Sequence, residues 1–182
     1  MNAELNFIRQ QGFPNASADS CAYQYPALMW QPRIIGPLLL LGVLLQSRGY
    51  FFVLGTLLWW NAAVPRLNPF DALYNFLVAK PGNLPFLGPA PGPRRFAQAM
   101  AGTFMLAIGV ALVSGLHGLA WSLEAVLLTA VAALVFGRFC LGSYVFHLAR
   151  GQAGFANRTL PWSRTDGPGQ RHGYGGSSNS PL

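Results

Sequence analysis

The stretch from Ser122 to Arg150 restricts the possible folds more than any other part of the chain. It is almost continuously apolar, and about twenty helical residues span about 30 Å, the thickness of the hydrocarbon core of a bilayer. We therefore predict a membrane-spanning helix over residues 121–149. Three further apolar runs predict spans at 34–48, 50–65 and 96–116. The expected fold is an all-α integral membrane protein with four transmembrane helices arranged as two hairpins.

The composition agrees with a lipid-facing protein. Charged residues make up only 9% of the chain and hydrophobic residues 52%, whereas soluble domains usually carry about 25% charged residues. The net charge of +7 does not indicate nucleic acid, because the basic residues flank apolar runs and no helix-turn-helix or zinc-finger spacing is present. The expected partners are the lipid bilayer and a membrane protein, or a second copy of the chain.

The chain is predicted to have three parts. Residues 1–33 form a cytoplasmic and interfacial segment in which Pro14 and Pro26 interrupt regular structure. Residues 34–150 form the four-helix membrane domain. Residues 151–182 form a polar tail, rich in Gly and Ser, that is expected to be largely disordered in the cytoplasm.

An amphipathic interfacial helix is predicted over residues 69–79, between the two hairpins. Asn68 can cap this helix, Pro69 suits its first position, and Asp71 falls in its first turn. The proline- and glycine-rich residues that follow predict an extended loop up to the third span.

The basic residues predict the orientation of the protein. With four spans, Arg48 alone lies on one side, and the other side holds the basic residues at 9, 33, 66, 80, 94, 95, 150, 158, 164 and 171. Cytoplasmic loops carry an excess of Lys and Arg. Both termini are therefore expected in the cytoplasm.

Rows of small residues predict close packing of the third and fourth spans. Small residues let helices approach each other in lipid. They recur every four residues on both spans, at Ala107, Ala111 and Gly115 and at Ala125, Thr129, Ala133 and Gly137.

Cys140 is the first candidate for chemistry, because it shares a predicted helix face with Tyr144 and His147. A thiol and an imidazole on one stripe suit a reactive thiol or a pair of metal ligands. However, the seven residues from Cys140 to His147 correspond to about 10 Å of helix, which prevents direct contact. Buried cysteine also commonly acts as a small hydrophobe, so packing, thiol reactivity and metal binding all remain open.

Arg138 is the second candidate, because on a continuous helix it would lie roughly 15 Å deep in the bilayer. An arginine inside a membrane is costly and often functional. We expect its partner to be Asp71 or loop carbonyls, since Glu124 would be about 21 Å away along the same helix. Glu124 itself is expected at the outer interface. A structural, snorkelling arginine and a contact for an anionic solute are the two interpretations.

Three segments, NPFDALYN, APGPRRFAQAMAGTFML and FCLGSYVFHL, resemble domain-of-unknown-function family 4395, whose members are small bacterial integral membrane proteins. The resemblance covers roughly residues 65–151 and extends to the first hairpin. In many members the cysteine equivalent to Cys140 is followed by a second one, as Cys-x-x-Cys, but this chain has Ser143 at that position. The resemblance implies a membrane fold in the bacterial cytoplasmic membrane. It implies no established activity, and the missing cysteine weakens a redox role.

No phosphate-binding loop, nucleophile elbow or pair of carboxylates on one helix face is found. We therefore expect no cofactor and no enzymatic activity. The predicted function is a non-catalytic accessory or scaffold subunit of a larger membrane assembly. The alternatives are a thiol-dependent redox protein acting through Cys140 and a small transporter of an anionic solute using Arg138.

Overall fold

The structure is a computed structural model that describes residues 2–163. Every regular element in this range is a helix, which confirms the all-α prediction there. The elements are α1 (Asn2–Gln10), α2 (Ala18–Leu45), α3 (Arg48–Ala63), η1 (Pro65–Leu67), α4 (Pro69–Tyr74), η2 (Asn75–Ala79), α5 (Gly92–Val113), α6 (His117–Val135), α7 (Leu141–Ala149) and α8 (Ala153–Arg158). Most of the predicted disordered tail lies outside the described residues.

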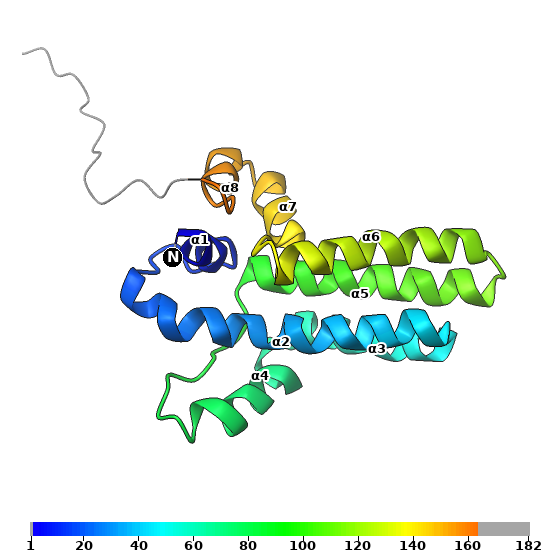
Figure 1. The fold of residues 1–182 in the computed structure, drawn as a ribbon, viewed down its shortest axis with the longest axis horizontal. Coiled ribbons are helices and arrows are strands. Elements are labelled where there is room, and N and C mark those ends of the chain that lie inside the picture. The colour runs from blue at the N-terminus through cyan, green and yellow to red at the C-terminus, as the bar shows by residue number, and fades with distance from the viewer. Residues whose placement is uncertain (1, 164–182) are drawn as a thin grey trace, which may run out of the picture.

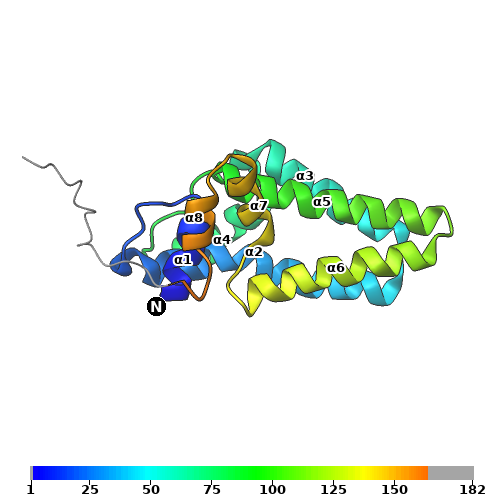
Figure 2. The ribbon, with the colours of Figure 1, turned by 90° about the horizontal axis from the view of Figure 1, so that it is seen from above.

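The four long helices α2, α3, α5 and α6 lie side by side along the long axis of the molecule (Figures 1 and 2). The connections from α2 to α3 and from α5 to α6 are at one end, which we call the turn end. The short helices α1, α4, α7 and α8 gather at the other end, the base (Figure 1). Within the described range, α2, α5 and α6 are long and apolar enough to cross a membrane, whereas α3 has only 16 residues.

Helix α3 packs mainly on α5, and α2 packs on α6. The backbones of α3 and α5 approach closely at Gly55 and Gly102, where a Cβ on Gly102 would lie 2.9 Å from the Gly55 carbonyl oxygen. The helices α5 and α6 also contact each other. However, the predicted small-residue face of α6 is not in that contact, because Ala125 and Thr129 line an open groove on the surface.

Helix α2 begins at Ala18, so the predicted run 34–48 covers only its second half and 1–33 is not a separate segment. Ser17 caps it, with a reciprocal hydrogen bond between Ser17 and Ser20. Pro26 lies inside the helix, as do Pro32 and Pro37, so the predicted interruption at Pro26 is wrong. Proline removes one hydrogen bond but holds φ near helical values, and in apolar surroundings leaving the helix would expose more backbone groups.

The predicted fourth span, 121–149, is wrong as one continuous helix. Helix α6 ends at Val135, and α7 starts at Leu141. At Gly137 a Cβ would lie 2.6 Å from the Ala133 carbonyl oxygen, and Arg138 adopts a left-handed φ of 55°. Any other residue at 137 would clash with the backbone of α6, so glycine allows the chain to turn sharply here.

The helix predicted over 69–79 is present as α4 followed by the π-helical turn η2. Its start is as expected: Asn68 accepts a hydrogen bond from the Phe70 amide, Pro69 occupies the first turn, and Asp71 follows. Tyr74 of α4 packs edge-on against Trp30 of α2, with ring centroids 5.9 Å apart. Burial raises the pKa of the Tyr74 phenol.

Candidate functional site

A buried ion pair lies where α2, α4 and α5 meet near the base. Arg94, in the first turn of α5, donates from Nη1 to Asp71 Oδ2 at 3.1 Å and from Nη2 to Asp71 Oδ1 at 2.5 Å. The side chains are only 6% and 8% exposed. A planar guanidinium matches a carboxylate in this two-bond arrangement. Arg94 and Asp71 therefore neutralise each other within the protein.

Three amide side chains extend this pair into a network that we call the Arg94 cluster: Gln31, Asn68, Asp71, Arg94 and Gln98. Asn68 Nδ2 donates to Asp71 Oδ2 at 2.9 Å. Gln31 Oε1 accepts from Arg94 Nη2 at 3.1 Å and from Gln98 Nε2 at 2.8 Å. This leaves Gln98 Oε1 buried without a hydrogen-bond partner.

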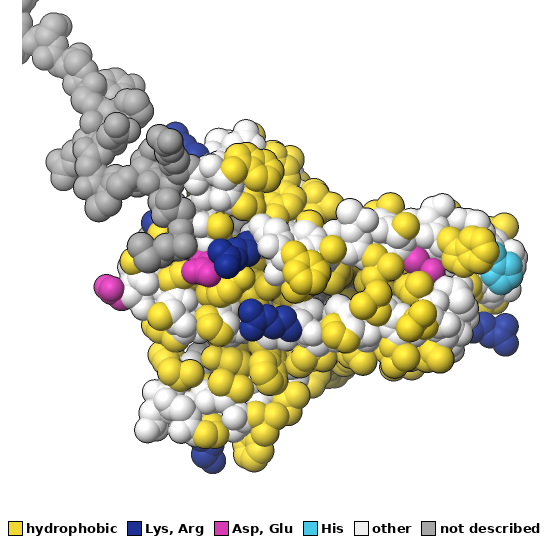
Figure 3. Space-filling model, viewed as in Figure 1, with side chains coloured by type: hydrophobic (Ala, Val, Ile, Leu, Met, Phe, Trp, Pro, Cys, Tyr) yellow, Lys and Arg dark blue, Asp and Glu magenta, His cyan; other side chains and the backbone are white. Residues whose placement is uncertain are grey.

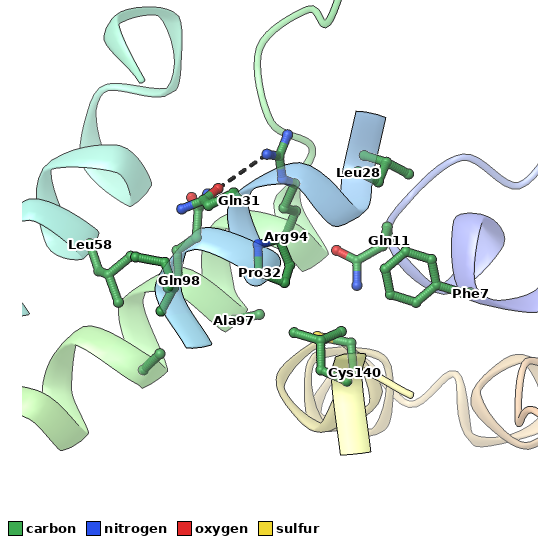
Figure 4. A pocket seen from close by; sticks show the side chains of 13 residues that line it. Phe7, Gln11, Leu28, Gln31, Pro32, Leu58, Arg94, Ala97, Gln98 and Cys140 are labelled. Carbon is green, nitrogen blue, oxygen red and sulfur yellow. Dashed lines mark hydrogen bonds between the residues drawn. The ribbon is translucent and has the colours of Figure 1, made fainter. Parts of the chain in front are cut away.

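A cavity of about 90 Å³ adjoins the Arg94 cluster (Figure 4). It lies between the end of α1, helices α2, α3 and α5, and the connection from α6 to α7, and most of its walls are apolar. Its polar lining consists of Gln11, Gln31, Arg94 and Gln98, together with Cys140. The Arg94 cluster and this cavity form the candidate site.

Cys140 is buried at the cavity wall as the residue that precedes α7. Its backbone amide donates to Gln10 Oε1 at 3.0 Å, and Ser143 Oγ donates to its Sγ at 3.4 Å. Because α6 and α7 are separate, Cys140 is not on the small-residue stripe predicted for a single helix. Cys21 belongs to the same apolar cluster, and both cysteines are free.

His147 does not line the cavity that Cys140 lines. Its Nε2 lies 3.1 Å from the Gln10 carbonyl oxygen and its Nδ1 lies 2.9 Å from Gln152 Oε1. A metal ion would have to displace one of these contacts. Nowhere in residues 2–163 do three His, Cys, Asp or Glu side chains come together as a metal site would require.

Arg138 lies beyond the end of α6, where it pairs with Glu4 of α1 at 3.2 Å and its guanidinium lies 5.5 Å from the centre of the Tyr25 ring. The predicted pairing of Arg138 with Asp71 is wrong, because Asp71 binds Arg94. The prediction failed because it assumed one continuous helix across the break at Gly137. An anionic solute at Arg138 would have to compete with Glu4.

Glu124 is buried inside the bundle near the turn end, and its place at the level of the outer membrane interface stays a prediction. Both carboxylate oxygens accept from Gln46 Nε2 at 3.0 Å. Gln46 adopts a left-handed φ of 46° as it ends α2, and this turn brings the amide to α6.

Sequence reasoning missed Gln11, Gln31, Arg94 and Gln98. Arg94 was assigned with Arg95 to the positive side of the membrane, and the glutamines stood out little beside apolar runs. One signal was available: Arg94 and Gln98 are four residues apart and share one face of α5. Two long polar side chains on the buried face of an apolar helix indicate an internal polar site.

A family model described as a domain of unknown function (DUF4395) matches residues 30–150. The match covers more than half of the chain, and the chain belongs to this family. It includes the whole Arg94 cluster and Cys140, and it begins after Gln11. No curated protein and no solved structure matches the chain.

Proposed function

We propose that this DUF4395 protein is an integral membrane protein in which all four long helices cross the bilayer. Support comes from the large apolar side chains that the long helices expose, among them Leu44, Val53, Val110 and Val126. Hydrophobic side chains cover much of these helices (Figure 3). Helix α3 has 16 residues and is about 24 Å long. A span of this length requires local thinning of the bilayer or flanking side chains that reach its surface.

We further propose that the base faces the cytoplasm of a bacterial cell. Arg48 starts α3 at the turn end. Arg9 lies in α1, Arg66 in η1 just before α4, Lys80 directly after η2 and Arg95 in the first turn of α5, all toward the base. This asymmetry is the one expected when positive residues remain on the cytoplasmic side. The protein would then be a multi-pass protein of the cytoplasmic membrane with both ends inside the cell.

The proposed role is a non-catalytic accessory or scaffold subunit of a larger membrane assembly. The observation that carries this proposal is that the buried charged groups are bound within the protein: Arg94 pairs with Asp71, and the Glu124 carboxylate accepts from the neutral Gln46 amide. Groups used in this way hold helices together. The base also exposes large aromatic side chains that are available to a partner, namely Phe76, Phe86 and Trp162.

Affinity purification after mild solubilisation and crosslinking tests this role. We expect a defined partner, or a second copy, to co-purify with the wild-type protein and to be lost from a Phe86→Ala/Trp162→Ala variant. Leu44→Ala, an equally exposed apolar change on α2 away from the base, is the matched control and should retain the partner. A monodisperse protein that never brings down a partner contradicts the proposal.

Reporter fusions test the four spans. A cytoplasm-active reporter inserted in the loop at residues 81–90 should be active, and the same reporter inserted after Gln46 or after Gly115 should be inactive. Activity after Gln46 with inactivity after Gly115 would mean that α2 and α3 do not both cross.

A second candidate role is thiol–disulfide exchange through Cys140. The observation in its favour is the cavity that reaches Cys140 in a cluster that also holds Cys21. In such a step the Cys140 sulfur, as thiolate, would bond to one sulfur of a partner's disulfide, and the other sulfur would leave as a thiolate. Trapping of a mixed disulfide in Cys21→Ser but not in Cys140→Ser supports this role. A Cys140 that forms no mixed disulfide until the protein is denatured excludes it.

A further inference from the structure

We propose that Arg33 binds the phosphate of an anionic phospholipid in the cytoplasmic leaflet of the membrane. Arg33 is an exposed residue in the middle of α2, the longest of the helices in the described range that are apolar enough to cross a membrane. It belongs neither to the Arg94 cluster nor to the aromatic surface proposed for a partner protein. The inference rests on the proposed orientation, in which the base faces the cytoplasm.

Arg33 lies on the side of α2 that faces away from the bundle. The residues that this half of α2 exposes are Arg33, Pro37, Leu40, Leu41, Leu44 and Leu45. At 3.6 residues per turn, Arg33, Pro37 and Leu44 lie within about 40° of one another on the helix surface. Ile35 and Leu39, on the other side of the helix, belong to the hydrophobic core. In a bilayer, Arg33 therefore shares a stripe with residues that contact lipid.

Arg33 has no charge partner among the residues that the structure describes. The ion pairs there join Arg94 to Asp71 and Arg138 to Glu4, and the Arg33 side chain makes no hydrogen bond to a described residue. An arginine within a membrane usually faces the bundle interior and pairs with another polar group. Arg33 does neither, so its charge requires a partner from outside the described residues.

The position of Arg33 along α2 places it below the level of the lipid headgroups. It is about 20 Å of helix away from Gln46, the residue that ends α2 at the turn end. A hydrocarbon core of about 30 Å that begins at Gln46 therefore ends about 10 Å beyond Arg33, near Pro26. Tyr23 and Tyr25 also lie at this level of α2, and aromatic side chains of this kind gather at membrane interfaces.

The direction of α2 decides which leaflet Arg33 meets. Side chains on a helix lean toward its N-terminus, and the N-terminus of α2 lies at the base (Figure 1). The Arg33 side chain therefore leads toward the headgroups on the base side, while its apolar stem stays among hydrocarbon chains. At the end of this path the guanidinium meets lipid phosphates.

The chemistry of the guanidinium favours an anionic lipid. A planar guanidinium can donate two parallel hydrogen bonds to one phosphate. A zwitterionic headgroup brings its own cation beside the phosphate, whereas phosphatidylglycerol brings none, so phosphatidylglycerol compensates the charge of Arg33 more completely. The acyl chains of this lipid would then run along the same stripe, past Pro37 and Leu44, toward the middle of the bilayer.

Native mass spectrometry of the full-length protein in mild detergent tests the site. Phosphatidylglycerol and phosphatidylcholine with the same acyl chains are titrated separately, and the affinity of the first bound lipid is measured. Arg33→Gln removes the charge, and Arg33→Lys keeps the charge without the two-bond geometry. Arg158→Gln removes the same charge from an exposed residue of the short helix α8 and is the matched control.

We expect the wild-type protein to bind phosphatidylglycerol more tightly than phosphatidylcholine. Arg33→Gln should weaken the binding of phosphatidylglycerol by about tenfold, the factor that corresponds to one hydrogen bond between charged groups. Arg33→Lys should weaken it less, and Arg158→Gln should leave it unchanged.

Four results would overturn the proposal. They are equal affinity of the wild-type protein for both lipids, unchanged binding in Arg33→Gln, equal weakening in Arg158→Gln, and displacement of the lipid by inorganic phosphate at the same concentration. Loss of a co-purifying protein from Arg33→Gln with unchanged lipid binding would also overturn it, because Arg33 would then pair with a carboxylate of a partner helix.

The orientation is decided separately by the reporter fusions. A cytoplasm-active reporter that is active after Gln46 and after Gly115 but inactive in the loop at residues 81–90 would refute the cytoplasmic base, and with it the choice of leaflet. A missing phosphate site would appear only in the lipid titration, so the two failures are distinguishable.

Discussion

Asp71→Asn changes the charge at the centre of the Arg94 cluster with almost no change in volume. In the wild-type protein the carboxylate receives three hydrogen bonds, two from Arg94 and one from Asn68. In the variant, Arg94 remains a buried cation with no opposite charge beside it. The asparagine NH₂ group would also face the guanidinium, which can only donate.

The expected cost follows from burial. Removing one partner of a buried ion pair costs about 3–5 kcal/mol, because the other charge stays buried and unpaired. An exposed pair contributes only about 0–1 kcal/mol. The structure supplies such a pair in Glu4 and Arg138, whose side chains are 27% and 40% exposed. We therefore expect Asp71→Asn to cost about 3–5 kcal/mol and Glu4→Gln about 0–1 kcal/mol.

The assay is reversible unfolding in mixed micelles, followed by tryptophan fluorescence as the denaturing detergent is increased. Replacing both partners tests the reason for the effect. Asp71→Asn/Arg94→Met removes both charges, so it should be less destabilised than Asp71→Asn alone. The reasoning is refuted if Asp71→Asn costs no more than Glu4→Gln, or if the costs of the two single changes simply add in the double variant.

Three further predictions concern other parts of the bundle. In the same unfolding assay, Gly102→Ala should destabilise the protein by about 1–3 kcal/mol, because its Cβ would clash with the α3 backbone. The control Gly49→Ala has open space around its Cβ position and should be close to neutral. Gln46→Asn keeps a residue that tolerates the left-handed turn, but the shorter side chain cannot reach Glu124. The unfolding midpoint should therefore fall by the equivalent of about 1–3 kcal/mol. An unchanged unfolding midpoint would show that the Gln46–Glu124 contact contributes nothing to stability. Because burial raises the pKa of Tyr74 in the folded state, its contribution to stability is complete below about pH 10 and is lost as the pH rises further. Wild type should therefore lose more stability than Tyr74→Phe as the pH rises above about 10, and parallel curves would contradict this.

The sequence alone was sufficient for the elements whose signals are local. The apolar runs at 50–65 and 96–116 match α3 and α5 to within a few residues at each end. The start of α4 was predictable in atomic detail, because an asparagine cap, a first-turn proline and a nearby carboxylate act within one helical turn. The break after α6 was missed because the apolar character continues on both sides of Gly137 and one glycine inside a helical pattern is usually tolerated.

Long-range contacts decided the rest. No feature of the neighbouring sequence distinguishes Arg94 from Arg95. However, Arg94 is buried against Asp71 and Gln31, while Arg95 donates to the Ala62 carbonyl. The choice depends on which face of α5 meets α2 and α4, where Gln31 and Asp71 lie. Helices long and apolar enough to cross a membrane could be predicted from the sequence, because a membrane span requires a long apolar segment. Which polar side chains meet inside the bundle is a property of the packed structure, since their partners come from helices far apart in the sequence.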